Sequence, residues 1–242
     1  MLVLAIDTCD ARGGVALLRS GELVGVLAHT SAEDYSSWLL PAVDTVVKKA
    51  GVLIRDVDGF GVAAGPGSFT GVRIGLTTVK GWAEVYGKPI AAVSRLVAVA
   101  MQAQNGAGTV AASVDAQRGQ VFGAVYQRRG ADLSRVGDEM VIAPGKFISA
   151  AAELASGRAI SWASTDPDCL ANVAEWQERA MLQEAIELVP SFLAPVVAQM
   201  AATDLAAGRH TDALHLDANY VRRSDAEIFW KGSAAGRGKL GC

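Results

Sequence analysis

The segment LVLAIDTCDARGGVALLRSGELVGVLAH, residues 2–29, decides the fold. Its first part, Leu2–Thr8, is a continuous apolar run, which is typical of a buried strand. Two shorter apolar runs, Val15–Arg19 and Leu23–His29, follow on either side of the turn Ser20-Gly21. The segment therefore predicts three consecutive strands that form an antiparallel meander.

The segments that follow alternate between helix and strand patterns. Apolar residues at helical spacing predict a helix over Asp34–Ala50, with Lys48-Lys49 in its last turn. An apolar strand at Gly59–Ala64 is followed by a helix over Gly71–Tyr86 and another over Ser94–Gln104. Strands that alternate with helices indicate an α/β domain whose sheet is covered by helices.

The pattern of the first strands restarts about 110 residues later. Ile6-Asp7 and Arg12-Gly13 have counterparts in Val114-Asp115 and Arg118-Gly119, each between two apolar runs. An internal repeat of this length predicts two similarly built lobes. The second lobe is expected to continue with strands at Thr109–Val114, Val121–Tyr126 and Arg158–Ala163, and helices at Pro144–Ala155, Leu170–Ala185 and Ser191–Ala207.

Composition excludes several classes of protein. The chain has 242 residues, of which 51% are hydrophobic and 19% charged, so it can bury a real core. Its net charge of −3 argues against a protein that grips nucleic acid alone, and three scattered cysteines argue against a disulfide framework. The first apolar run stops at Asp7, and no run reaches the roughly 18 residues of a membrane span. We therefore expect a cytoplasmic protein without a membrane segment.

The two Asp turns are candidate phosphate sites. An Asp behind a buried strand can hold a metal or water near a nucleotide phosphate, and facing hairpins in two lobes bind phosphates in actin-like ATPases. The alternative is that each Asp caps its own turn through backbone hydrogen bonds, and this reading is favoured. The residues concerned are Asp7, Thr8, Asp115, Arg118 and Gly119.

The string GPGSFTGVRIG, residues 65–75, lies between a strand and a helix. It is not a Walker P-loop, because no Gly-Lys-Ser/Thr follows, and it is not a nucleophile elbow, because Pro66 stands where the first Gly of that motif belongs. It predicts either an anion site at a helix N-terminus or a tight turn capped by Ser68 or Thr70. Its structural part comprises Gly65, Pro66, Gly67, Ser68, Phe69 and Thr70.

Small residues on the helix Gly71–Tyr86 predict a close helix contact. Glycines cost about 1 kcal/mol each in a helix, so a packing contact must compensate for them. Core packing within the lobe and docking of a partner protein explain them equally well. The candidate docking residues are Trp38, Leu39, Val43, Val46, Gly71, Gly75, Thr78 and Trp82, and a folded Gly75→Leu variant is expected to lose its partner.

Catalytic residues are not evident in the sequence. The three histidines, His29, His210 and His215, form no HExxH motif, and no nucleophile with a neighbouring base is apparent. We therefore predict no catalytic residue and no metal site.

At Ile6-Asp7-Thr8, Leu39-Leu40-Pro41, the string 65–75, Ser113-Val114-Asp115 with Arg118-Gly119, and Tyr220-Val221-Arg222, the chain resembles the bacterial TsaB (YeaZ) family. The resemblance covers nearly everything to about Trp230. It implies an actin-like (ASKHA) α/β fold of two ribonuclease-H-like lobes, each a mixed sheet with helices. The expected boundaries are 1–105 for the partner-binding lobe, with the 190–208 helix packing back on it, 106–189 for the second lobe, and 209–242 for an extension with a flexible end.

The resemblance also implies a role in tRNA modification. Members of this family are the non-catalytic subunit that activates a TsaD-like transferase, which places threonylcarbamoyl on the adenosine beside the anticodon. A TsaE-like ATPase joins the pair, tRNA is contacted only indirectly, and the subunit alone can form a homodimer. Basic residues near the end, Arg222, Arg223, Lys231, Arg237 and Lys239, more often form a solvated tail than a tRNA contact.

Departures from active relatives agree with a non-catalytic subunit. The chain lacks the HxxxH metal pair of TsaD-like enzymes and shows no adenosine-binding Gly-Gly turn between Ala155 and Leu170, so at most weak ATP or ADP binding is expected. Tyr35 stands where many relatives carry His. The alternatives are an independent actin-like ATPase or kinase and, with less support, a glycoprotease-type peptidase.

Overall fold

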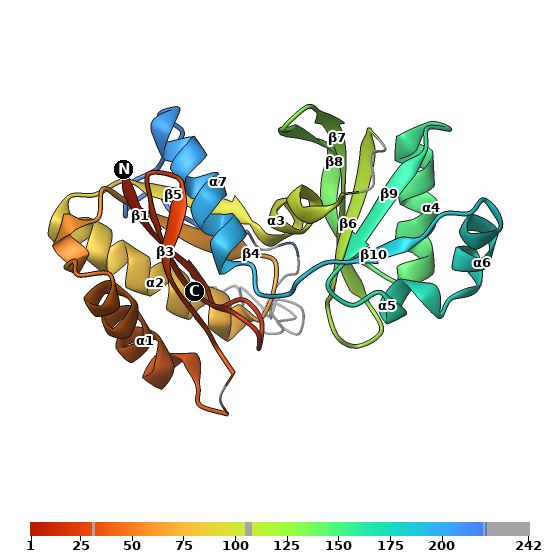
Figure 1. Cartoon of the computed structure of the whole chain (residues 1–242). Helices are drawn as coiled ribbons and strands as arrows, with labels where there is room; N and C mark the ends of the chain where they lie inside the picture. The colour runs from red at the N-terminus through yellow and green to blue at the C-terminus, as the bar shows by residue number, and fades with distance from the viewer. Residues whose placement is uncertain (31, 105–107, 220, 222–242) are drawn as a thin grey trace, which may run out of the picture.

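The computed structural model describes residues 1–30, 32–104, 108–219 and 221, and it contains two five-stranded mixed sheets (Figure 1). The first sheet has the strand order β3-β2-β1-β4-β5. Strands β1, β2 and β3 form the predicted antiparallel meander, and β4 and β5 run parallel to β1. The strands span Leu2–Asp7 (β1), Gly14–Arg19 (β2), Glu22–Ala28 (β3), Gly59–Gly65 (β4) and Ile90–Ser94 (β5).

The second sheet repeats this topology. Its order is β8-β7-β6-β9-β10, again a meander of three antiparallel strands followed by two parallel ones. The two sheets confirm the α/β repeat that was predicted from the sequence. The strands span Thr109–Asp115 (β6), Val121–Arg129 (β7), Asp132–Ile142 (β8), Ile160–Ser164 (β9) and Ile186–Leu188 (β10).

Helices cover both sheets and cross between them (Figure 1). Helices α1 and α2 lie on one face of the first sheet, and α7 packs on its other face. Helix α3 contacts strands of both sheets, more of them in the second, although 1–105 was expected to form the first lobe. The helices span Tyr35–Lys49 (α1), Phe69–Tyr86 (α2), Arg95–Gln102 (α3), Pro144–Ala155 (α4), Asp168–Ala171 (α5), Ala174–Met181 (α6) and Ala194–Ala206 (α7), and a 3₁₀ turn spans Ile54–Asp56.

One hydrophobic core runs through both lobes. It joins buried residues of the first sheet, α3 and α7 to one face of the second sheet, including Val114 and Phe122. A smaller core around Phe147 and Trp162 lies on the other face of the second sheet, under α4 and α6. Within the described residues, no helix is long and apolar enough to cross a membrane.

Strands β5, β8 and β10 were not predicted, and two of the predicted helices differ in the structure. The helix predicted over Leu170–Ala185 is wrong: the backbone is extended at Val173, which separates α5 from α6, and β10 follows. Strand β5 was not predicted because it runs straight into α3, with Ser94 ending the strand and capping the helix. Strand β8 was missed because it is largely exposed and its polar residues break the alternation. The last helix begins at Ala194 rather than Ser191.

The glycines of residues 65–75 pack against the end of β1. A side chain at Gly67 would collide with the carbonyl of Cys9, and one at Gly71 with the carbonyl of Thr8. A Cβ at Gly75 would lie 2.6 Å from Thr8 Oγ1. The Thr8 hydroxyl donates to the Gly71 carbonyl at 2.6 Å, so α2 and β1 are joined by a hydrogen bond as well as by close packing. The glycines therefore serve a contact within the lobe.

Two glycines of α2 should respond in opposite ways to alanine. Gly75→Ala forces a methyl group against Thr8, and overpacking of this kind costs about 1–3 kcal/mol. Gly81 is exposed and has open space around its Cβ position, so Gly81→Ala should stabilise the protein by about 1 kcal/mol through helix propensity. Urea denaturation of both variants measures the difference. Equal effects of the two substitutions would contradict this packing model.

Candidate functional site

A cleft of about 1250 Å³ lies between the two lobes. The ends of β1 and β4, the start of α2 and the turn after β6 all contribute to it, together with Asn219 and Val221 from the end of the described chain. Four carboxylates line it, those of Asp10, Glu33, Asp34 and Asp115, as do three arginines, Arg73, Arg95 and Arg118. Arginine side chains bind phosphate through charge-assisted hydrogen bonds, so an excess of positive groups favours a phosphate site. The cleft shows no such excess among its described lining residues.

Asp7 does not face the cleft but forms a buried ion pair. Its side chain is fully buried, and its Oδ2 lies 3.4 Å from Nε of Arg95, which is itself almost fully buried. A second nitrogen of Arg95 contacts Asp10 Oδ2 at 3.2 Å. Burial opposes the charge of Arg95, yet the carboxylates of Asp7 and Asp10 raise its pKa above the usual value. The sequence analysis considered Asp7 as a residue that could hold a metal near a phosphate. In the structure, the cation beside Asp7 is the guanidinium of Arg95.

Both Asp turns are held by the same local hydrogen bond. Asp7 Oδ1 accepts from the N–H of Cys9 at 2.9 Å, and Asp115 Oδ1 accepts from the N–H of Gln117 at 2.8 Å. This geometry agrees with the reading in which each Asp caps its own turn. Of the predicted phosphate residues, Thr8, Asp115 and Arg118 line the cleft, whereas Asp7 and Gly119 do not.

The cysteine at the first turn is chemically inert. Cys9 is buried, and its thiol donates to the carbonyl of Ala63 at 3.2 Å. Burial, and then the neighbouring carboxylate of Asp7, raise the pKa of the Cys9 thiol well above its usual value. The thiolate is the nucleophilic form of cysteine. Cys9 therefore gives no support to a peptidase.

Three potential metal donors gather in the second lobe. Single donor atoms of Asp115, Asp166 and Cys169 lie within 4.8 Å of one another. Both carboxylate oxygens of Asp115 accept hydrogen bonds from Gln117. Burial and the Asp166 carboxylate raise the pKa of the Cys169 thiol to about 12. A metal ion would have to displace both the thiol proton and these hydrogen bonds.

Tyr35 joins the start of α1 to the β1–β2 turn. Its hydroxyl accepts from the N–H of Gly13 at 2.7 Å and donates to the carbonyl of Asp10 at 2.5 Å. Its ring packs against His29 and, edge-on, against Trp38. Burial raises the pKa of the Tyr35 phenol, so it stays protonated and keeps both hydrogen bonds. The residue that departs from the family pattern is thus a structural clamp.

Most of the predicted docking residues are buried in the first lobe. Leu39, Val43, Val46, Gly71 and Gly75 are buried within this lobe and are not exposed on its surface. Trp38, Thr78 and Trp82 are half-buried. Gly75 faces Thr8 and not solvent, so the packing gives no support to the expectation that Gly75→Leu leaves the monomer folded.

The outer face of α1 and α2 consists of other residues. Leu40 is 55% exposed and Val85 is 73% exposed, although both are apolar. On α2, Thr77 and Gly81 are also exposed, and there is open space around the Cβ position of Gly81. Helical periodicity predicted that the helices are amphipathic, but the adjacent Leu39 and Leu40 do not reveal from sequence which one points outward.

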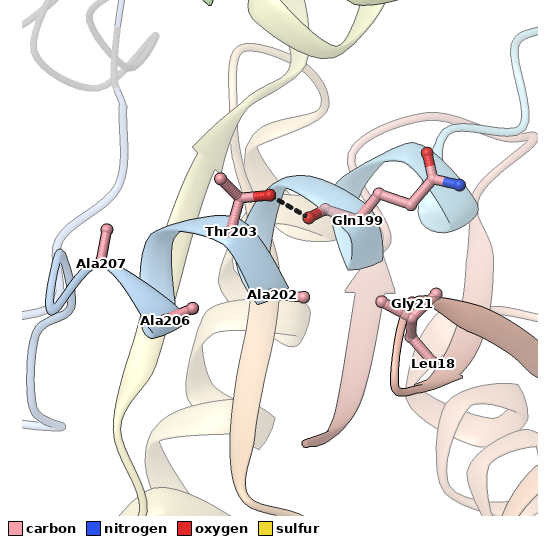
Figure 2. A pocket seen from close by; sticks show the side chains of 7 residues that line it. All are labelled: Leu18, Gly21, Gln199, Ala202, Thr203, Ala206 and Ala207. Atoms are coloured by element: carbon pink, nitrogen blue, oxygen red, sulfur yellow. Dashed lines mark hydrogen bonds between the residues drawn. The ribbon is translucent and has the colours of Figure 1, made fainter.

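A shallow hollow lies on the opposite side of the first sheet (Figure 2). It has a volume of about 650 Å³ between the β2–β3 turn and α7, and small side chains such as Ala202 and Ala206 form its floor. Thr203 donates its hydroxyl hydrogen bond to the Gln199 carbonyl at 3.1 Å, within the helix. No titratable group lines the hollow, so it offers no catalytic chemistry.

Arg95 was missed by the sequence analysis, although an arginine inside the apolar segment 90–100 is a visible signal. Arg95→Met should lower the free energy of unfolding by about 3–5 kcal/mol, because it leaves Asp7 buried without its cation. Lys48→Met is the control, since Lys48 and its carboxylate partner Asp44 are both exposed. Chemical denaturation measures both, and equal losses would contradict a special role for the buried pair.

Comparison with known proteins agrees with this structure. The family model for tRNA N6-adenosine threonylcarbamoyltransferase (TsaD) matches residues 19–228. The tRNA threonylcarbamoyladenosine biosynthesis protein TsaB of Bacillus subtilis is 36% identical over 136 residues, which cover 56% of this chain and 59% of that protein. TsaB of Escherichia coli is 37% identical over 130 residues, covering 53% and 56%. The matched part thus spans less than two thirds of the length of these relatives.

A solved structure extends the similarity over nearly the whole chain. YeaZ from Pseudomonas aeruginosa superposes with a TM-score of 0.66 at 26% identity, covering 90% of this chain and 99% of that one. Together with the repeated sheet topology, this match confirms the two-lobed, actin-like α/β fold. The chain belongs to the family of the TsaD model and, within it, to the TsaB (YeaZ) proteins.

Proposed function

We propose that this chain is the non-catalytic subunit of a tRNA threonylcarbamoyladenosine complex, in which it pairs with and activates a TsaD-like transferase. The names of its TsaB relatives support a role in this biosynthesis. The observation that carries the proposal is on the outer surfaces of α1 and α2, where the apolar side chains of Leu40 and Val85 are exposed. Exposed apolar side chains that gather into a contiguous patch mark protein contacts, and we assign these two to such a docking surface.

The chemistry of the cleft supports a non-catalytic role. Arg95 already neutralises Asp7 and Asp10, the Cys9 thiol is buried and protonated, and one oxygen of each of Asp7 and Asp115 accepts a hydrogen bond from its own turn. A transferase or kinase instead needs groups that are free to bind substrate and develop charge. In this proposal the TsaD-like partner supplies the active site, a TsaE-like ATPase joins the complex, and tRNA is bound through the assembly.

Gly81 offers a direct test of the docking face. Gly81→Leu adds bulk to an exposed position with open space, so the monomer should remain folded. The added side chain should separate the helices at a close contact and weaken pairing with a TsaD-like partner at least tenfold, which corresponds to about 1.4 kcal/mol. Thr203→Leu, at an exposed position on the opposite side of the sheet, is the matched control. Analytical ultracentrifugation measures both affinities and also any homodimer of the chain alone.

The same variants connect docking to activity. The TsaD-like partner, a TsaE-like ATPase, ATP, the carbamoyl-adenylate donor and tRNA are combined with wild type, with Gly81→Leu, or without this chain. Transfer of threonylcarbamoyl should require the chain and fall with Gly81→Leu but not with Thr203→Leu. Equal transfer with and without the chain would contradict the proposed function. Normal pairing by Gly81→Leu would contradict only the assigned face.

An independent ATPase is the second candidate function, and the nucleotide affinity of the isolated chain separates the two. The acidic lining of the cleft and the engaged Asp7 lead us to expect ATP or ADP binding weaker than about 1 μM, which corresponds to about −8.2 kcal/mol, and no measurable hydrolysis. Isothermal titration calorimetry with Mg²⁺-ATP provides the measurement. Sub-micromolar binding with turnover would favour the ATPase.

A further inference from the structure

Glu139 of β8 is a buried carboxylate that joins three parts of the chain. Its side chain is only 4% exposed. Oε1 accepts a hydrogen bond from the hydroxyl of Ser94 at 2.6 Å, and Oε2 accepts one from the side-chain amide of Asn219, also at 2.6 Å. Ser94 ends β5 in the first sheet, β8 belongs to the second sheet, and Asn219 lies near the end of the described chain. One carboxylate therefore connects both lobes with the C-terminal segment.

The C-terminal segment is itself attached to the first lobe at two points. After α7, Thr211 forms a two-way backbone bridge with Ile90 of β5, with N–O distances of 2.8 and 2.9 Å. Eight residues later, the N–H of Asn219 donates to the carbonyl of Ala64 in β4 at 2.8 Å. Ala64 directly precedes the glycine-rich loop that leads into α2. The segment thus follows the first sheet to the cleft, where Asn219 reaches across to Glu139.

The chemistry of this junction requires a carboxylate. Both partners of Glu139 donate, and an ionised carboxylate accepts on both oxygens, so the two hydrogen bonds are charge-assisted and strong. Arg135 lies 3.8 Å away and is half exposed, which makes it a weak partner. The buried phenol of Tyr126 lies beside the same group, and burial and then the Glu139 carboxylate raise its pKa. Tyr126 therefore stays neutral and adds no competing charge.

We infer that Glu139 is an inter-lobe latch, which fixes the opening of the cleft by holding the second lobe to Ser94 and to the C-terminal segment at Asn219. The core that runs through both lobes keeps them attached at α3, while the latch limits how far they move about that attachment. Loss of the latch should widen the range of lobe positions without unfolding either sheet. This inference does not depend on the proposed function, because it concerns the isolated chain.

Glu139→Gln tests the latch with little change of shape. The amide oxygen still accepts from Asn219 and the amide NH₂ can donate to the Ser94 hydroxyl, but the negative charge that strengthens both hydrogen bonds is lost. Asp138→Asn is the matched control, since it removes one negative charge from the neighbouring, exposed residue of the same strand. Asn219→Ala removes the hydrogen bond between Glu139 and the C-terminal segment, which belongs to neither sheet.

Lobe positions are measured by the distance between spin labels at Thr203→Cys in α7 and Met181→Cys in α6, both exposed. Cys169 and Cys242 are replaced by serine, and Cys9 is buried and protected. The distribution should be at least twice as broad in Glu139→Gln and Asn219→Ala as in wild type and Asp138→Asn. Wild-type widths in folded Glu139→Gln would overturn the inference. If Glu139→Gln does not fold, Asn219→Ala provides the test. A distance distribution as narrow in Asn219→Ala as in wild type would then overturn the inference.

Discussion

The contact between α2 and the end of β1 is the constraint on which the first lobe depends. Gly67, Gly71 and Gly75 lie against Thr8 and Cys9 so closely that no side chain fits between them. This contact fixes the loop after β4, the start of α2 and the turn after β1 relative to one another. Glycines beside a strand and a helix N-terminus resemble a ligand cradle in sequence, but here the group that approaches closely is the chain itself.

The acidic turn after β1 is likewise held by a contact within the chain. An Asp at the end of a buried strand can hold a cation. In this chain the cation beside Asp7 is Arg95, which is the first residue of α3. Because α3 also packs between the two sheets, the ion pair secures the junction of the lobes. A buried pair of this kind is strongly destabilising to break. The fold that supports nucleotide chemistry elsewhere is here stabilised by its own side chains.

Sequence patterns predicted the meander, the repeat, α1 and α2 because each depends on local periodicity and turn chemistry, and of the two caps they left open for α2, Ser68 and Thr70, the structure has Ser68. They did not predict β10 or the break at Val173, where tertiary contacts decide short elements. They also failed on orientation: Gly75 and Gly81 are the same residue type in one helix, yet one faces Thr8 and the other faces solvent. Arg95, Glu139 and Asn219 act across 80 residues or more, which no local pattern records.

Rigidity and the proposed role are physically consistent. Actin-like enzymes that turn over nucleotide depend on lobes that close on the ligand, so a shared core, a buried ion pair at Arg95 and a carboxylate junction at Glu139 all oppose that motion. A protein that acts by docking has the opposite need. Its interface helices must be presented in one arrangement, because preorganisation reduces the entropy lost on binding. The close packing of Gly67, Gly71 and Gly75 against Thr8 and Cys9 holds α2 against β1, so the exposed surface of this helix is presented in one arrangement before any partner binds.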